Sequence, residues 1–580
     1  MKNTVLFLVF LMTSAAFVQK LDQSASPPTD PAFDRYKNHF LEALWKQNPD
    51  WATSRGYHRY DSVLIVPDAQ SRQSSLAFVK NHLDSLDRFE VNRLSALNQI
   101  DYWLIQNQLR RTRWEIDTLR SHEWDPSDYN VTGSFAIILN EPYAPLATRL
   151  RSFYKKMATI PAYYEAVQKQ LQNPVVELTK LAVNQHLGGV SVIETNFVDS
   201  LKKSTIPAVE QRQMLSRAQS SAQAIKRHVA WLNALPHKNP RSLRLGKALY
   251  ERKFAYNIQS IYTAEQMYQS ALTRKKYLHR QMAELSAKLW PRYFGSKPMP
   301  ADTLDLVRRM IDTLSVQHVK PEAFQASIEQ QLPKLVAFVK EKDLLYIDPS
   351  KPLVVRTEPG YMAGVAGASV SAPGPYDKNG NTYYNVGSMA GWSADQAESY
   401  LREYNQYILQ ILNIHEAIPG HYTQLVYANQ SPSLIKSVLS NGAMIEGWAV
   451  YTEQMMLENG YGNQQPELWL MWYKWNLRSV CNTIVDYSVH TSTLTRDDVI
   501  KLLTREAFQQ QAEADKKWTR VTVSSVQLTS YYTGFKEIID LREAYKQKKG
   551  DAYRLKTFNE TFLSYGNSPV KYIRQLMLTN

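Results

Sequence analysis

Amphipathic helical periodicity dominates the first half of the chain. Between about residue 31 and residue 350, long segments carry apolar residues at alternating spacings of three and four, which places those residues on one face of an α-helix. Three clear examples are residues 33–47, 209–235 and 264–290. The pattern predicts long antiparallel helices, and we therefore expect a mainly α fold.

The pattern changes between residues 352 and 392, where Gly, Pro, Asn and β-branched residues become frequent. A turn signal at residues 377–381 predicts a short β-hairpin over about 365–387, directly before a helix predicted over about 394–418. We expect the hairpin to present an edge strand to an extended peptide, with Tyr384 beside the substrate or the site. A hairpin that serves packing alone is the alternative.

Residues 1–18 are typical of a secretory signal peptide, because Lys2 precedes an apolar run that ends in small residues. The run is shorter than the roughly 20 residues of a membrane-spanning helix. Residues 19–30 then form a polar, proline-rich linker. We expect an exported protein, periplasmic or extracellular, without a stable membrane anchor after cleavage.

Composition limits the remaining possibilities. The 580 residues, 44% of them hydrophobic, can bury a large core. We divide the chain after the linker into a helical N-terminal part (31–350) and a C-terminal part (351–580). The formal net charge is +14, but basic and acidic residues alternate along the helices, as on solvated faces, so no nucleic-acid partner is expected. The single cysteine, Cys481, excludes an intrachain disulfide and is expected to be a buried, inert thiol.

Two histidines lie close together in HEAIPGHYTQ, which begins at His415. His415 and His421 are six residues apart, or about 240° around an ideal helix, so an uninterrupted helix could not direct both at one ion. Pro419 and Gly420 lie between them, and these are the residues that most readily break a helix. We predict that the helix breaks there and that the chain brings His421 back beside His415.

Carboxylates complete the pattern. Glu416 follows His415, and IEGWAVYTE places Glu446 and Glu453 seven residues apart, on one face of a predicted helix. Two imidazoles and one carboxylate, with a fourth position open, are typical ligands of catalytic zinc. We predict a Zn²⁺ site formed by His415, His421 and Glu446, within the C-terminal part of the chain. An ordinary helix end with two incidental histidines is the alternative.

These motifs resemble those of zinc peptidases. IEGWA resembles the NEGFA segment of metallo-aminopeptidases, and the interval from His421 to Glu446 is similar to that of gluzincins such as angiotensin-converting-enzyme-like peptidases. HEAIPGHYTQ followed by EGWAVYTE resembles more closely the bacterial domain of unknown function 885 family, which is grouped with zincin metallopeptidases. Residues 48–64, 485–490 and 525–534 match the opening and closing motifs of that family, so the resemblance covers nearly the whole chain after the signal segment.

The resemblance implies a large zincin-like helical body and an exported zinc metallopeptidase that hydrolyses peptides, in particular short ones. Zinc would activate a water molecule, with Glu416 as the general base. The family's closing motifs make Tyr531 and His490 candidate catalytic donors, although His490 is equally consistent with a core histidine.

Further roles remain to be assigned. The candidates that support a ligand or contact the substrate are Glu453, Asp486 and Arg520. Two alternatives stay open: another zinc-dependent amide or ester hydrolase, and a non-catalytic helical protein that binds peptides. The chain contains no G-x-S-x-G elbow and no phosphate-binding glycine loop. The motifs do not indicate the oligomeric state.

Overall fold

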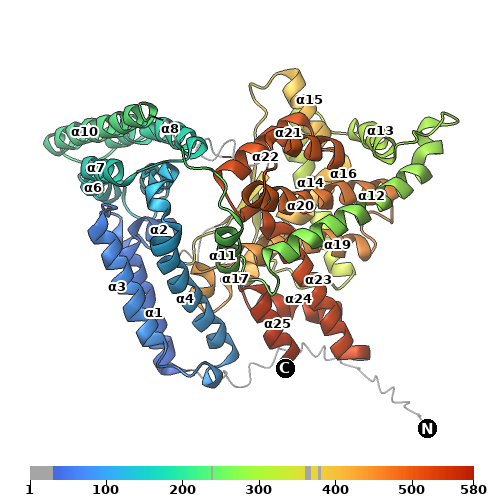
Figure 1. Ribbon diagram of the computed structural model, residues 1–580, viewed down its shortest axis with the longest axis horizontal. Coiled ribbons are helices and arrows are strands. Elements are labelled where there is room, and N and C mark those ends of the chain that lie inside the picture. Colours follow the sequence, from blue (N-terminus) through green and yellow to red (C-terminus); the bar gives the residue numbers. More distant parts are fainter. Residues whose placement is uncertain (1–29, 237–239, 359–367, 377–380, 580) are drawn as a thin grey trace, which may run out of the picture.

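The computed structural model of the protein describes residues 30–236, 240–358, 368–376 and 381–579. The expected signal peptide, and the expected linker up to residue 29, lie outside these ranges. The fold is mainly α with one small sheet, which confirms the expected class. Helices α1 to α10 form what we call the N-terminal lobe, at the left of Figure 1, and helices α11 to α25 form the central body.

The N-terminal lobe contains two groups of helices with separate cores, one of which also takes in residues of α18 and α25 from the central body. The helix predicted over residues 33–47 is α1, whose apolar residues Phe33, Phe40 and Leu44 are buried on one face. The helix predicted over 209–235 is α10, which packs on α7 and α8. The bounds are α1 (Pro31–Gln47), α2 (Pro49–Ser54), α3 (Ala69–Leu86), α4 (Ala96–Trp114), α5 (Thr132–Asn140), α6 (Leu146–Met157), α7 (Ile160–Gln170), α8 (Val176–Ser191), α9 (Val198–Lys202) and α10 (Ala208–Asn233).

The central body is built around the long helices α12 and α20, which pack along each other (Figure 1). Its core takes in residues on both sides of position 350. Helix α12 begins with a capping box, in which the Thr263 hydroxyl accepts from the Gln266 backbone N–H and the Gln266 side chain accepts from the Thr263 backbone N–H. The helices before the sheet are α11 (Lys247–Asn257), α12 (Ala264–Phe294), α13 (Thr303–Ser315) and α14 (Phe324–Glu341).

The sheet has the strand order β1-β3-β2. Strands β2 and β3 are antiparallel and form the expected hairpin, although residues 365–367 and the predicted turn at 377–380 lie outside the described ranges. The sequence did not predict β1, which pairs parallel to β3. The bounds are β1 (Leu353–Thr357), β2 (Ala368–Ser371) and β3 (Thr382–Val386).

The helix expected over residues 394–418 is in fact two helices. Its first part ends at Glu403, and Asn405 then caps the second part, because its side-chain oxygen accepts from the backbone N–H groups of Tyr407 and Ile408. The helices after the sheet are α15 (Ala394–Glu403), α16 (Gln406–Glu416), α17 (His421–Asn429), α18 (Leu434–Val438), α19 (Gly442–Glu458), α20 (Pro466–Thr491), α21 (Arg496–Lys501), α22 (Gln511–Val523), α23 (Ser530–Lys549), α24 (Leu555–Ser564) and α25 (Val570–Thr579).

A buried ion pair joins the N-terminal lobe to the central body. The Asp101 carboxylate of α4 lies 2.6 Å from the Lys436 ammonium of α18, and both side chains are 1% exposed. The Ser433 hydroxyl also donates to Asp101. Because both charges are paired and further hydrogen-bonded, their burial costs far less than that of an isolated charge.

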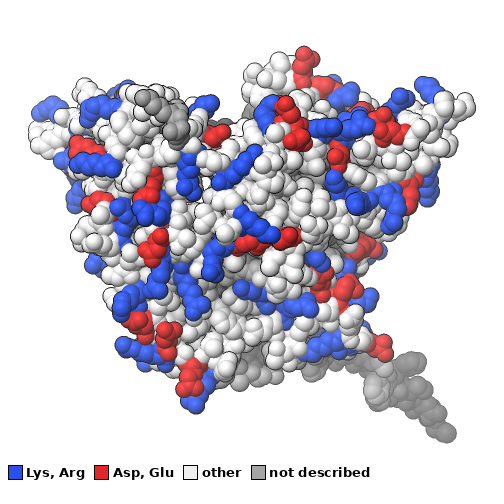
Figure 2. All heavy atoms as spheres, in the orientation of Figure 1, with Lys and Arg blue, Asp and Glu red and all other residues white. Residues whose placement is uncertain are grey.

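The surface carries charges of both signs. On the face drawn in Figure 2, lysines and arginines are interspersed with aspartates and glutamates, and the upper edge is notched between the N-terminal lobe and the central body. Among the described residues, no helix combines the length and the apolar character needed to cross a membrane.

Candidate metal centre

Helix α16 ends with His415 and Glu416, and helix α17 begins with His421, so the chain breaks where Pro419 and Gly420 predict a break. The peptide bond between Ile418 and Pro419 is cis. The Gly420 backbone N–H donates to the Ile414 carbonyl at 3.0 Å, which folds the turn back against α16. A β-carbon at Gly420 would lie 1.9 Å from the His415 carbonyl oxygen, so only glycine fits there.

Helix α19 supplies the carboxylates. Its Trp448 side chain donates to the Pro419 carbonyl at 2.9 Å and thereby fixes the turn against α19. At the neighbouring residue, α19 crosses α23 through two glycines: a β-carbon at Gly447 would lie 2.3 Å from the Gly534 carbonyl carbon. The absence of side chains there lets the two helices approach closely.

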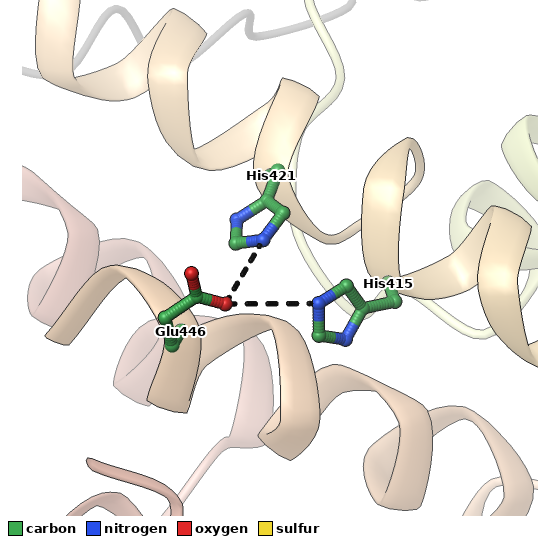
Figure 3. A group of neighbouring side chains, drawn as sticks. All are labelled: His415, His421 and Glu446. Carbon is green, nitrogen blue, oxygen red and sulfur yellow. Dashed lines mark ion pairs between the residues drawn. The ribbon is translucent and has the colours of Figure 1, made fainter. Parts of the chain in front are cut away.

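His415, His421 and Glu446 converge on one point (Figure 3). One Glu446 oxygen lies 3.5 Å from His421 Nε2 and 3.9 Å from His415 Nε2, and the three ligand atoms lie within 4.8 Å of one another. Ligand atoms at about 2.0–2.1 Å around a tetrahedral zinc ion would be roughly 3.3 Å apart. The donor set and its spacing therefore fit zinc after small side-chain adjustments.

Glu453 contacts Nδ1 of His415, the ring nitrogen that does not face Glu446. Its carboxylate, 0% exposed, lies 2.7 Å from His415 Nδ1, and the Trp475 indole donates to the same oxygen at 3.1 Å. Burial raises the pKa of Glu453, whereas the Trp475 contact lowers it. In the tautomer whose Nδ1 donates to Glu453, Nε2 carries the lone pair and faces Glu446, which is the arrangement that a metal-binding histidine requires.

The protonation states of His415 and Glu446 also suit ligation. Burial and the neighbouring His421 lower the pKa of His415 to about 4, so this imidazole is neutral at neutral pH, and a neutral imidazole binds metals. Burial would raise the pKa of Glu446, but the contact with His421 lowers it below its usual value. His421 Nδ1 is buried without a hydrogen-bond partner among the described residues.

Glu416 is positioned beside this group and is not one of its three converging ligands. Burial raises its pKa, while His421 and His415 act in the opposite direction. A carboxylate that is next to the ligands but separate from them is free to exchange a proton.

Tyr384 connects the sheet to α16, the helix that carries His415. It is 0% exposed, and its hydroxyl donates to the Asn413 side chain of α16 at 2.8 Å. Asn413 in turn donates to Gln331 of α14. Of the two roles expected for Tyr384, this burial favours support of the site over contact with a substrate.

Tyr531 and Arg520 lie on the side of the centre formed by α22 and α23. One Arg520 nitrogen donates to the Gln527 side chain at 2.7 Å and to the Tyr531 hydroxyl at 3.4 Å. Tyr531 is half-buried. Burial, followed by the negative charge of Glu446, raises its pKa, and Arg520 lowers it. The charges of Glu446 and Arg520 therefore both act on the Tyr531 hydroxyl, in opposite directions.

His490 has a structural environment, which argues against its expected catalytic role. It is 3% exposed, its Nε2 lies 2.9 Å from the Val521 carbonyl and 2.8 Å from the Ser524 carbonyl, and its ring stacks on Tyr250. A nitrogen committed to backbone carbonyls inside the core cannot serve a substrate. This is the environment of a core histidine, which was the alternative role that the sequence allowed for His490.

Asp486 orders the turn before Tyr531. Its carboxylate accepts from the backbone N–H groups of Val526 and Leu528 and from the Tyr250 hydroxyl. Val526 and Leu528 lie just before α23, so Asp486 stabilises the backbone that leads into the helix of Tyr531.

Sequence reasoning missed a buried charge network next to the centre. Arg478 of α20 lies 3.2 Å from Glu513 and 3.7 Å from Glu403, and its charge lowers the pKa of His415. Lys474 pairs with Glu403 at 2.8 Å. The only available signal was the spacing of four residues between Lys474 and Arg478, which solvated helix faces show equally.

Comparisons with known proteins place the chain in a family. The sequence profile of a bacterial protein of unknown function, DUF885, matches residues 49–577. No curated protein matches the chain. A solved structure of a candidate lipoprotein of unknown function from Shewanella oneidensis is 51% identical, with a TM-score of 0.88, and the match covers 96% of this chain and 100% of that one.

A second solved structure, of a candidate lipoprotein from Colwellia psychrerythraea, is 15% identical, with a TM-score of 0.76, and covers 94% of this chain and 99% of that one. At this identity the likeness shows a shared fold alone. The family profile, in contrast, spans most of the sequence, as does the Shewanella relative. The chain therefore belongs to the bacterial family of proteins of unknown function DUF885.

Proposed function

We propose that this protein is an exported, gluzincin-like zinc metallopeptidase that hydrolyses peptide bonds, in particular those of short peptides. The observation that carries the proposal is the convergence of His415, His421 and Glu446, whose ligand atoms lie within 4.8 Å of one another across a broken helix. The buried Glu453 beside His415 supports it, because metal-ligating histidines almost always hydrogen-bond through their other ring nitrogen to a carboxylate, a backbone carbonyl or water.

Each group of the site would have a separate role in peptide hydrolysis. A bound zinc ion would supply a Lewis acid that polarises the substrate carbonyl and activates water. Glu416 would accept the proton of that water and pass it to the leaving amine. Tyr531 would donate to the oxyanion that develops on the substrate, and Arg520, 3.4 Å from its hydroxyl, would favour that negative charge.

The sheet offers a place for the peptide backbone. Strand β2 is an edge of the sheet and contacts α16, the helix that carries His415. An edge strand leaves backbone N–H and C=O groups unpaired, and these can pair with an extended peptide. We assign this role to β2, so that the peptide backbone would lie along α16.

An exported location is consistent with two observations. The first 18 residues have the composition of a secretory signal. The two similar solved structures are described as candidate lipoproteins. We place the protein in the periplasm or outside the cell.

The test combines metal content with turnover. Wild-type protein and a Glu416→Gln variant are loaded with zinc, assayed by elemental mass spectrometry, and incubated with a library of short peptides. Both should hold about one zinc per chain, and the variant should lose at least about a hundredfold in turnover, because it lacks the general base. Glu322→Gln, at an exposed position away from the centre, is the matched control and should match wild type.

Three results would contradict the proposal in different ways. An active Glu416→Gln variant would remove Glu416 from the role of base. Zinc-loaded wild type that binds peptides without cleaving them would indicate a binding protein. Cleavage confined to esters or non-peptide amides would indicate a different zinc hydrolase.

A further inference from the structure

A second site lies where the N-terminal lobe meets the central body. A polar cavity of about 320 Å³ is enclosed by α2 and α4 of the lobe and by the segments that follow α11 and precede α19. This volume would hold about ten water molecules at about 30 Å³ each and is near the lower limit for small-molecule pockets. It suits a small polar ligand.

Arg55 gives the cavity a positive charge. It follows α2, lines the cavity and is half-buried, yet among the described residues it forms no ion pair, and its Nε has no hydrogen-bond partner. Burial lowers its pKa. The other charges on the wall, Arg111 and Glu115, neutralise each other at 2.8 Å. A partly buried cation without a counter-ion is costly, and an anion would offset that cost.

Two hydrogen-bond acceptors lie where α11 ends and on the segment that follows it. Gln259 is 6% exposed, and its side-chain oxygen has no partner among the described residues. The side-chain oxygen of Asn257, two residues earlier, also lacks a partner. Buried amide oxygens without donors are uncommon, and here both belong to residues that line the cavity. They would accept from an ammonium group.

We propose that this cavity binds a free amino acid, with the carboxylate on Arg55 and the ammonium on the side-chain oxygens of Asn257 and Gln259. A guanidinium is a suitable partner for the carboxylate of such a zwitterion, and amide oxygens are suitable acceptors for its ammonium group. Trp51 and Tyr256 also line the cavity and provide a surface for the side chain of the ligand. The proposal is independent of the metal centre, because it uses none of the residues assigned there.

Calorimetry with individual amino acids tests the proposal. At least one amino acid should bind wild-type protein with a Kd at or below about 1 mM. Its C-terminal amide and its N-acetyl derivative should each bind at least about tenfold more weakly, because each loses a charge-assisted hydrogen bond. Short peptides that end in the same residue distinguish a free amino acid from a peptide terminus.

Variants then locate the binding site. Arg55→Gln and Gln259→Met should each weaken binding about tenfold or more. Gln259→Met keeps the side-chain size, so it carries the test even where loss of Arg55 impairs folding. Arg59→Gln, whose side chain is 66% exposed on the same segment, and His421→Ala should leave binding unchanged.

Two results would overturn the proposal. Absence of binding by every amino acid at millimolar concentration would mean that the cavity holds water only. Binding that survives Gln259→Met but disappears in His421→Ala would place the ligand at the metal centre.

Discussion

At the scale of single residues, the contact between Glu453 and His415 is the most informative. A Glu453 carboxylate that accepts from Nδ1 would leave Nε2 as the nitrogen that binds a metal. We predict that Glu453→Gln lowers zinc affinity about 10- to 100-fold, measured by competition with a chelator. Glu458→Gln, at an exposed position on the same helix, should retain wild-type affinity. Equal affinities in all three proteins would contradict this role.

Two adjacent tyrosines allow a sharp test of the oxyanion donor. The Tyr531 hydroxyl contacts Arg520 beside the metal centre, whereas the Tyr532 hydroxyl contacts Ser270 of α12. We predict that Tyr531→Phe reduces kcat about a hundredfold without changing the zinc content, because one donor to the oxyanion is lost. Tyr532→Phe should have little effect on kcat. If both variants turned over as fast as wild type, another group would stabilise the oxyanion.

At the scale of elements, the crossing of α19 and α23 sets the geometry of the site. A β-carbon at Gly534 would lie 1.7 Å from the Ala443 carbonyl oxygen and 2.8 Å from the Gly447 α-carbon. Helix α19 carries Glu446 and α23 carries Tyr531. The spacing of these two helices therefore affects how the proposed metal ligand Glu446 and the candidate donor Tyr531 face each other.

We predict that Gly534→Ala destabilises the protein by about 1–3 kcal/mol through overpacking and also weakens zinc binding, because α19 must move. Thermal unfolding and zinc titration of the same samples measure both effects. Gly442→Ala is the matched control, since a β-carbon at this position at the start of α19 meets no atom within 4 Å. A Gly534→Ala protein with wild-type stability would show that the helices can separate without cost.

At the scale of the whole molecule, buried histidines couple the stability of the N-terminal lobe to pH. Burial, assisted by His39, lowers the pKa of His82 to about 4, and burial, assisted by His186, lowers that of His228 to about 3. In the unfolded chain both titrate near 6.5. As the pH falls below about 6.5, the unfolded state takes up protons that the folded state does not, so stability falls.

Other groups act in the opposite direction. Burial raises the pKa of Asp128 and of Glu537 to about 7, so the folded state takes up their protons first and gains stability as the pH falls. A single substitution isolates one contribution. We predict that in His228→Gln the loss of stability between pH 6.5 and pH 4 is smaller than in wild type, by up to about 1.4 kcal/mol per pH unit. Denaturant unfolding at several pH values measures the difference, and parallel pH profiles would exclude His228 as a contributor.

Much of the local structure could be predicted from the sequence. The three-and-four periodicity marked α1, α10 and α12, and the pair Pro419-Gly420 marked the break between α16 and α17. Such features depend on backbone chemistry and on neighbours within one or two turns, which a sequence displays directly. Strand β1 and the interruption before α16 were not predicted, because β1 depends on its partner β3, and Asn405 has a capping role only in its observed conformation.

By itself, the sequence determined the donor types and their order along the chain: two histidines around a helix break, followed by carboxylates on a later helix. Only the tertiary structure decided which distant side chains meet. It placed Glu453 against Nδ1 of His415 and placed Nε2 of His490 against backbone carbonyls. It also left Arg55 without a counter-ion among the residues that the structure describes. These outcomes depend on how helices far apart in sequence pack, as α19 and α23 do at Gly447 and Gly534, and that packing is not encoded in any short segment.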